Sequence, residues 1–330
     1  MKSSPGNYLN IFYDEPMGDR WLPWDRYPRA VVRRVVRGRP QPSGHRRVFL
    51  NLCEGLKTLG ILFRVNDYAF ARRNPSSLAC IVGKPAVLDK MKWRNPILLG
   101  ASIYSHPIDD PDVLSRFPIK KVLVPGDWMK DMFALSWGEM VESWPVGIQT
   151  NLWSPSAASE KTIDVLIYDK IRWRREEQES ELLEPVRQVL RSQNRSFVEL
   201  RYGFYKEEEF RELLAASKAM IFICEHETQG IAYQQALSCG VPIFAWDHGG
   251  AWMDPTYYPH RVTYGPVSSV PYWDERCGMK FASGTEFRRG WDSFWEGVVA
   301  NRFRPRDYIL ENLTLERCAD QYVRIARSLI

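Results

Sequence analysis

The sequence lacks long apolar runs, paired cysteine motifs and a large excess of either charge, and each absence excludes a class of protein. Its apolar stretches stay well short of the roughly 18 residues that cross a bilayer, so we expect no membrane-spanning helix. The N-terminus does not have the pattern of a signal peptide. None of the six cysteines stands in a Cys-x-x-Cys pair or beside spaced histidines, so we expect no metal site. Cysteines in apolar or helical runs are typical of a reducing compartment, and we therefore predict a cytoplasmic protein.

The net charge of +5 is too small for a dedicated nucleic-acid binder, and we expect no nucleic-acid partner. Basic residues do gather near the N-terminus, where seven arginines lie between Arg29 and Arg47. One interpretation is a solvated face of the protein. The other is a patch that makes peripheral contact with an anionic membrane, at its inner surface, or with a charged acceptor.

The 330 residues suffice for two domains that bury their cores without disulfide bonds. Both halves alternate apolar strand-like runs with segments of helical periodicity, which predicts parallel sheets covered by helices. The Ser-, Ala- and Pro-rich stretch 151–161 is typical of a linker. We therefore predict an N-terminal domain over residues 1–155 and a C-terminal domain over residues 156–330.

Strands are expected at 8–13, 62–65, 78–82, 97–101 and 121–124 in the first half, and at 164–168, 197–202, 219–224 and 241–246 in the second. Helices are expected around 44–59, 128–137, 182–190, 210–214, 231–238 and 315–330. Sheets of this kind bind ligands at the carboxyl ends of their strands. Two such domains in one chain predict a ligand cleft between them.

The most informative segment is Cys224–Pro242, in which an apolar strand ends in an acidic loop and a helix begins after Gly230. The free N–H groups and the positive end of that helix would bind a diphosphate or a sugar hydroxyl. Glu227, on the loop, can accept hydrogen bonds from sugar hydroxyls, and Gln235, two turns into the helix, is within reach of a ribose. The alternative is a purely structural strand–turn–helix in which Glu227 interacts with the helix dipole.

This segment resembles the signature of the family 4 retaining glycosyltransferases, which have the GT-B fold of two Rossmann-like domains facing each other across a cleft. In that family a Glu is followed by Gly three residues later, by a second Glu eight residues later, and then by Ala and Gly-x-Pro. The residues that match are Glu227, Gly230, Ala236, Gly240 and Pro242. The resemblance implies that Glu227 contacts the donor sugar, and that Thr228, Gln229, Gly230 and Ile231 line the donor site. The second Glu, which binds the nucleotide ribose, is replaced here by Gln235, which lacks the charge.

Other stretches are similar to the same family. Gly44 stands where the family has a glycine-rich turn before its first long helix, and Pro145–Ile148 is similar to the turn that ends its first domain. Lys170 and Arg174 or Arg175 occupy the positions of its basic residues for the diphosphate, which gains negative charge as the glycosidic bond breaks. His106 is a candidate for the family's cleft histidine, although a lone histidine is more often structural. The final helix is expected to pack on both domains.

The resemblance implies a metal-independent hexosyl- or glycosyltransferase (EC 2.4 class) that needs no cofactor. It would move a sugar from a nucleotide-sugar, such as a UDP- or GDP-sugar, to a hydroxyl of a glycan, a lipid-linked or a small-molecule acceptor. We expect retention of configuration and a place in glycan or polysaccharide biosynthesis. The alternatives are a nucleotide-sugar epimerase of the same fold and, because of Gln235, a catalytically weakened nucleotide-sugar-binding homologue.

Overall fold

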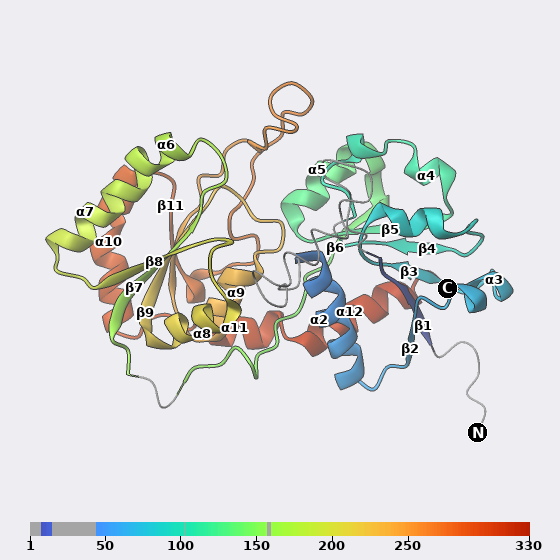
Figure 1. Ribbon diagram of the computed structural model, residues 1–330, viewed down its shortest axis with the longest axis horizontal. Helices are drawn as coiled ribbons and strands as arrows, with labels where there is room; N and C mark the ends of the chain where they lie inside the picture. Colours follow the sequence, from blue (N-terminus) through green and yellow to red (C-terminus); the bar gives the residue numbers. More distant parts are fainter. Residues whose placement is uncertain (1–7, 15–43, 102, 157–159) are drawn as a thin grey trace, which may run out of the picture. The chain divides into compact units, whose positions relative to one another are not determined.

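The computed structural model describes residues 8–14, 44–101, 103–156 and 160–330 (Figure 1). The chain divides into two compact units. The first unit contains Met1–Pro125, Lys130–Trp144 and Glu316–Ile330, and the second contains Gly126–Met129 and Pro145–Leu315. The long continuous part of the second unit starts at Pro145, whereas the boundary predicted from sequence is at residue 156, and most of the final helix belongs to the first unit. Ser43 and the basic residues between Arg29 and Arg39 lie outside the described residues.

The first unit contains a six-stranded sheet in which every paired strand is parallel to its neighbour. The strands, in sheet order, are β2 (Phe63–Val65), β1 (Leu9–Phe12), β3 (Ala79–Ile81), β4 (Ile97–Leu99), β5 (Ile119–Val124) and β6 (Val141–Ser143). The α-helices are α2 (Gly44–Thr58), α3 (Tyr68–Arg73), α4 (Val113–Arg116), α5 (Asp127–Trp137) and α12 (Leu315–Arg327), with 3-10 turns η2 (Pro85–Lys90), η3 (Pro107–Asp109) and η4 (Gly138–Met140). The first turn of α5, up to Met129, belongs to the second unit.

Helix α12 is joined to the first unit by an aromatic contact. The indole N–H of Trp144 donates to the carbonyl of Cys318 at 2.8 Å, and the ring of Trp144 lies edge-on to that of Tyr322. Trp144 and Tyr322 are both fully buried. The C-terminal helix is therefore part of the core of the first unit although it follows the whole second unit in sequence.

The second unit contains a five-stranded parallel sheet in the order β11 (Gly278–Phe281), β10 (Ile243–Trp246), β9 (Ser217–Cys224), β7 (Ile163–Lys170), β8 (Phe197–Arg201). Its helical segments are α6 (Arg175–Gln178), the π-helical η5 (Glu179–Leu183), α7 (Glu184–Ser192), α8 (Glu207–Ala216), α9 (Ile231–Ser238), η6 (Glu275–Cys277), α10 (Gly284–Val299) and α11 (Pro305–Asn312). From β7 the chain adds β8 on one side and β9 on the other. The strand order therefore reverses between β7 and β9, which is the position where doubly wound sheets bind ligands.

Helices cover both faces of this sheet (Figure 1). On one face Val165 and Ile167 of β7 pack in a core with apolar residues of α7 and α10. On the other face Tyr168 packs against Phe210 of α8, because successive side chains of a strand point to opposite faces. By the same alternation, Lys170 shares the face of Tyr168, and Asp169 faces α6.

The predicted α/β class with two parallel sheets is confirmed. Sequence periodicity identified β1–β5 and β7–β10, but it missed the strands β6 and β11 and the helices α3, α4, α10 and α11. The helix predicted at 182–190 begins earlier, since α6, η5 and α7 follow one another without a break, and Pro185 stands in the first turn of α7.

All six cysteines are free and buried. Cys53, Cys80 and Cys318 belong to the first unit, and Cys224, Cys239 and Cys277 to the second. Burial raises the pKa of each thiol, to about 11 for Cys53 and about 12 for Cys80, and well above the ordinary range for Cys224. Within the described residues, no helix is both long and apolar enough to cross a membrane. The same residues contain no cluster of three or more His, Cys, Asp or Glu that could hold a metal ion.

Candidate functional site

The sheet register brings Lys170 and Glu227 together at the carboxyl ends of β7 and β9. Lys170, the last residue of β7, lies opposite Cys224, the last residue of β9. The chain leaves β9 through Glu225 and His226, so that the carboxylate of Glu227 returns to the ammonium of Lys170 and forms an ion pair. This is the point where the strand order reverses, and the site predicted from sequence therefore coincides with the site that the topology favours.

The ion pair is largely enclosed, with the side chains of Lys170 and Glu227 only 12% and 10% exposed. Burial lowers the pKa of the Lys170 ammonium, but the Glu227 carboxylate, together with Cys224 and Tyr202, more than offsets burial, so that the pKa is raised. The ammonium also lies 4.5 Å from the ring centre of Tyr202. Lys170 therefore keeps its positive charge, and its three N–H donors allow contacts beyond Glu227.

The backbone of Glu227 is fixed from two sides. Its N–H donates to the carbonyl of Ser268 at 3.0 Å, and its carbonyl accepts from the indole N–H of Trp128 at 2.9 Å. The hydroxyl of Tyr264 donates in turn to the carbonyl of Trp128 at 3.0 Å. Residues distant in sequence thus hold the loop that presents the Glu227 carboxylate.

Arg172 and Glu225 connect the loop after β7 with the loop after β9. Glu225 Oε1 accepts from the backbone N–H groups of Arg172 at 2.8 Å and Trp173 at 3.0 Å. Arg172 Nη2 donates to the carbonyl of His226 at 2.8 Å and lies 3.2 Å from His226 Nε2. The two loops that carry Lys170 and Glu227 are therefore cross-linked in both directions.

His226 is enclosed by aromatic rings and is held neutral. Its ring stacks on Trp173 and lies edge-on to Trp128 and Trp252. Burial, together with the charges of Arg172 and Lys170, lowers the pKa of His226 to about 2. Its Nε2 accepts from the indole N–H of Trp252 at 3.1 Å, so the ring proton resides on Nδ1. His226 is thus a fixed acceptor and carries no charge at neutral pH.

Helix α9 begins at the predicted residue, and the conformation of Gly230 determines where it starts. Gly230 adopts φ +74°, and a Cβ there would come within 2.0 Å of Tyr233 Cε1, so only glycine fits. Glycine has no side chain to cap the helix, which leaves the first N–H groups of α9, from Ile231 onward, able to bind an anion.

The other predicted residues of this segment are Gln229, Thr228 and Gln235, and their side chains are placed differently. The Gln229 amide accepts from Val146 N at 3.0 Å and donates to Val146 O at 3.3 Å and Gln234 Oε1 at 3.1 Å, so it links the Pro145–Ile148 stretch to the loop. Thr228 is partly buried beside Glu227. Gln235 is buried on α9, 7% exposed.

The predicted arginines are engaged by carboxylates. Arg175 donates to Asp169 at 2.6 and 3.2 Å and to Glu179 at 3.2 Å, on the α6 side of the sheet. Arg174 is exposed and pairs with Glu177. Arg172 rather than either of these lies beside the loop that carries Glu227.

His106 and Gly44 belong to the first unit, so the geometry of the second unit does not include them. His106 has a local structural role at the start of η3, where its Nδ1 accepts from Ile108 N at 3.0 Å and Asp109 accepts from His106 N. Gly44 is the first described residue of α2. Their functional assignments remain predictions.

Sequence reasoning missed Glu225, His226 and Trp128 as members of the site. Glu225 and His226 stand directly after the β9 strand, so their position at a strand end was a usable signal. Trp128 is separated from Glu227 by 99 residues and carries no such signal.

No protein-family model matches the chain, and no curated protein matches it in sequence. Among solved structures, the chain is similar to the lipopolysaccharide outer core galactosyltransferase WaaB in its apo form, at a TM-score of 0.55 and 9% identity, over 98% of this chain and 100% of WaaB. It is also similar to a point mutant of S. aureus TarM in complex with fondaparinux, α-GlcNAc-glycerol and UDP, at a TM-score of 0.52 and 11% identity, over 78% of this chain and 57% of TarM.

The chain has the GT-B fold. A third match, the pneumococcal O-GlcNAc transferase GtfA in complex with UDP and GlcNAc, has a TM-score of 0.48 and 8% identity over 79% of this chain. The chain spans 59% of the length of GtfA, so it is considerably shorter than that protein.

Proposed function

We propose that the protein is a glycosyltransferase whose second unit binds a nucleotide-sugar at the carboxyl ends of β7 and β9. The observation that carries this proposal is the enclosed Lys170–Glu227 ion pair at the reversal of strand order, together with the free N-terminus of α9. The GT-B fold, shared with the galactosyltransferase WaaB, supports the same conclusion.

In the proposed mechanism the diphosphate is bound by N–H donors of Lys170 and by the first N–H groups of α9. As the glycosidic bond breaks, the leaving nucleoside diphosphate gains negative charge, and these positive groups stabilise it. Glu227 accepts hydrogen bonds from hydroxyls of the donor sugar. Because Glu227 is also paired with Lys170, sugar and diphosphate are positioned relative to each other by one ion pair.

The proposal also includes finer features of the reaction and of its location. They are retention of configuration, a hexose as the transferred sugar, an acceptor hydroxyl on a glycan, a lipid-linked or a small-molecule acceptor presented by the first unit, and a cytoplasmic location at or near an anionic membrane. The fold does not distinguish retention from inversion, since function depends on the site rather than on the fold.

The test is a thermal-shift screen of the purified chain with UDP, GDP, TDP and ADP, followed by NMR of donor and product with the matching nucleotide-sugar. A ligand at 100 times its Kd stabilises the native state by about 2.7 kcal/mol, so one diphosphate should raise the Tm clearly. Glu227→Gln should abolish most transfer, whereas the exposed α8 substitution Glu212→Gln should not alter it. Absence of a shift with every diphosphate, or full transfer by Glu227→Gln, would refute the proposal. Donor conversion without any acceptor would indicate an epimerase instead.

A further inference from the structure

The second unit contains a pocket of about 220 Å³ to which the proposed function assigns no role. It lies among the loops after β7, β9 and β10, and Gln178 of α6 borders it. Of the residues that the structure describes, neither Lys170 nor Glu227 lines this pocket. Two indole rings, Trp173 and Trp246, and the thioether of Met253 form apolar parts of its wall.

Glu225 provides a carboxylate oxygen with unused hydrogen-bonding capacity. The residue is 6% exposed and lines the pocket. Oε1 is occupied by the two backbone N–H groups of Arg172 and Trp173, whereas Oε2 is buried without a hydrogen-bond partner in the described part of the chain. Arg172 Nε is 3.9 Å from Oε2, beyond hydrogen-bonding distance. A buried polar atom of this kind is normally satisfied, which indicates that a ligand donor completes it.

His248 lines the same pocket and provides a donor. Its Nδ1 accepts from Gly250 N at 2.9 Å, so the neutral ring carries its proton on Nε2. The pocket therefore combines one acceptor that requires an O–H or N–H with one ring donor that requires an oxygen or nitrogen. A hydroxyl can both donate and accept, so adjacent hydroxyls satisfy both groups.

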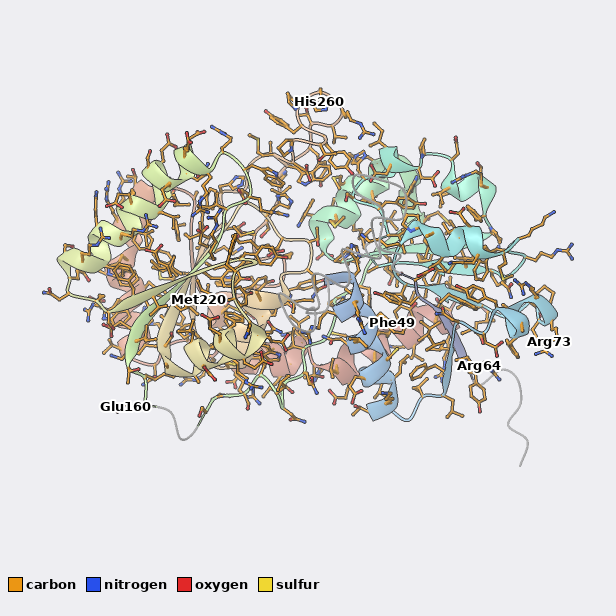
Figure 2. All side chains as sticks on the ribbon, in the orientation of Figure 1. Phe49, Arg64, Arg73, Glu160, Met220 and His260 are labelled. Atoms are coloured by element: carbon orange, nitrogen blue, oxygen red, sulfur yellow. The ribbon has the colours of Figure 1, made fainter. Side chains whose placement is uncertain are left out.

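The wall of the pocket that includes His248, Ala251 and Met253 comes from the long loop 247–274, which has no α-helix or β-strand (Figure 2 shows His260 near its tip). Trp252 and Tyr257 stack at 4.6 Å between ring centres, and Trp252 N donates to Tyr264 O at 2.7 Å, so aromatic residues order the loop. Long loops in compact domains usually have a binding function.

We propose that this pocket binds one pyranose ring of a saccharide. The apolar C–H groups of a pyranose suit the indole rings, and its hydroxyls suit Glu225 and His248. The pocket volume of about 220 Å³ has room for one six-membered ring.

This binding proposal does not depend on sugar transfer by the site at Lys170 and Glu227. The pyranose can come from the sugar of a nucleotide-sugar or from an acceptor or product glycan. The two sources share the same chemistry, and competition between ligands distinguishes them.

The test is saturation-transfer NMR of the full chain with the methyl pyranosides of glucose, galactose, mannose and N-acetylglucosamine, in the absence of nucleotide. At least one pyranoside should receive saturation. Trp173→Ala and Glu225→Gln should each weaken its binding by about tenfold, with folding checked by circular dichroism. Glu225→Gln keeps an oxygen for the two backbone N–H groups, so it changes mainly the group offered to the ligand. The matched control is Phe204→Ala, an aromatic residue that is 78% exposed on another loop of the same unit and should leave binding unchanged.

Competition by a nucleotide-sugar but not by its nucleoside diphosphate would support the proposal and assign the pyranose to the donor, in which case this pocket rather than Glu227 holds the donor sugar. Lack of competition by either would support it and assign the pyranose to a glycan. The proposal is overturned if no pyranoside binds, if both variants bind as tightly as the parent chain, or if a nucleoside or nucleoside diphosphate alone displaces the pyranoside. Failure of the thermal-shift screen with diphosphates would leave this result unaffected, so the two proposals can fail separately.

Discussion

Lys170 and Glu227 form an ion pair across 57 residues of sequence, between the ends of two neighbouring parallel strands. Each charge is enclosed, so each depends on the other for compensation. The pair thereby links the stability of the second unit to the groups that are proposed to bind the donor.

We expect Lys170→Met and Glu227→Gln each to destabilise the protein by about 3 kcal/mol, since each leaves the partner enclosed and unpaired. The double variant should be less destabilised than the sum of the two single variants, because neither charge then remains. Urea denaturation of the four proteins measures this coupling. Strictly additive losses would show that the pair is too well solvated to matter.

The neutral state of His226 predicts a loss of stability in acid. Its pKa is about 2 in the folded protein, below the ordinary value of 6.5, so the unfolded chain binds the proton more readily. The stability that depends on a neutral His226 is fully present above pH 6.5 and is lost progressively as the pH drops towards 2. Between pH 6.5 and 4.5 the free energy of unfolding should fall by about 2 kcal/mol on this account, since the unfolded histidine is already half-protonated at pH 6.5.

The measurement is the free energy of unfolding at both pH values for the parent chain, for His226→Gln and for the exposed control His260→Gln. The parent and the control should lose about 2 kcal/mol more than His226→Gln over this interval. If His226→Gln shows the same pH dependence as the parent, His226 is not held neutral by the fold.

Gly230→Ala should be much more harmful than Gly249→Ala. Both glycines have positive φ, +74° and +61°, so both substitutions carry a backbone penalty of about 1 kcal/mol or slightly more. Only at Gly230 does the new Cβ collide with Tyr233, and we expect a total loss of about 3 kcal/mol there. Thermal unfolding of the two variants separates the collision from the backbone effect, and equal losses would contradict the geometry at the start of α9.

Gln235→Glu should strengthen binding of the nucleotide-sugar by about five- to tenfold. The charged acceptor makes stronger hydrogen bonds to ribose hydroxyls than the neutral amide does. Calorimetric titration with the diphosphate that is positive in the thermal-shift screen measures the change, and the unliganded stability of the variant serves as the control for the buried charge. Unchanged or weaker binding would remove Gln235 from the ribose site.

Sequence patterns predicted helix α9 and the strand-end positions of Lys170 and Glu227 well, because local chemistry determines them. Helix α9 has the predicted limits because Gly230 and Gly240, with φ of +74° and +76°, permit conformations at its two ends that other residues adopt only with strain. Lys170 and Glu227 could be placed at strand ends, since both follow apolar runs. Their pairing with each other was not predictable, because it depends on the register of β7 and β9.

Other features depend on contacts between distant segments. Strand β11 reads Gly-Met-Lys-Phe, which is too short and too mixed to identify by alternation. Gly147 approaches the backbone of Leu315 so closely that a Cβ would lie 2.6 Å from Leu315 Cα, and no local pattern reports this contact. The aromatic enclosure of His226 likewise combines Trp128, Trp173 and Trp252 from three separate segments.

Three buried thiols lie in each unit, so the reactivity of the native cysteines can report the opening of each unit. A buried, protonated thiol reacts slowly with an alkylating reagent until the surrounding structure opens. Mass spectrometry of peptides containing Cys53, Cys80 or Cys318 would therefore time the opening of one unit, and peptides containing Cys224, Cys239 or Cys277 that of the other. The two halves of the chain can in this way be followed independently in a single sample, without any engineered label.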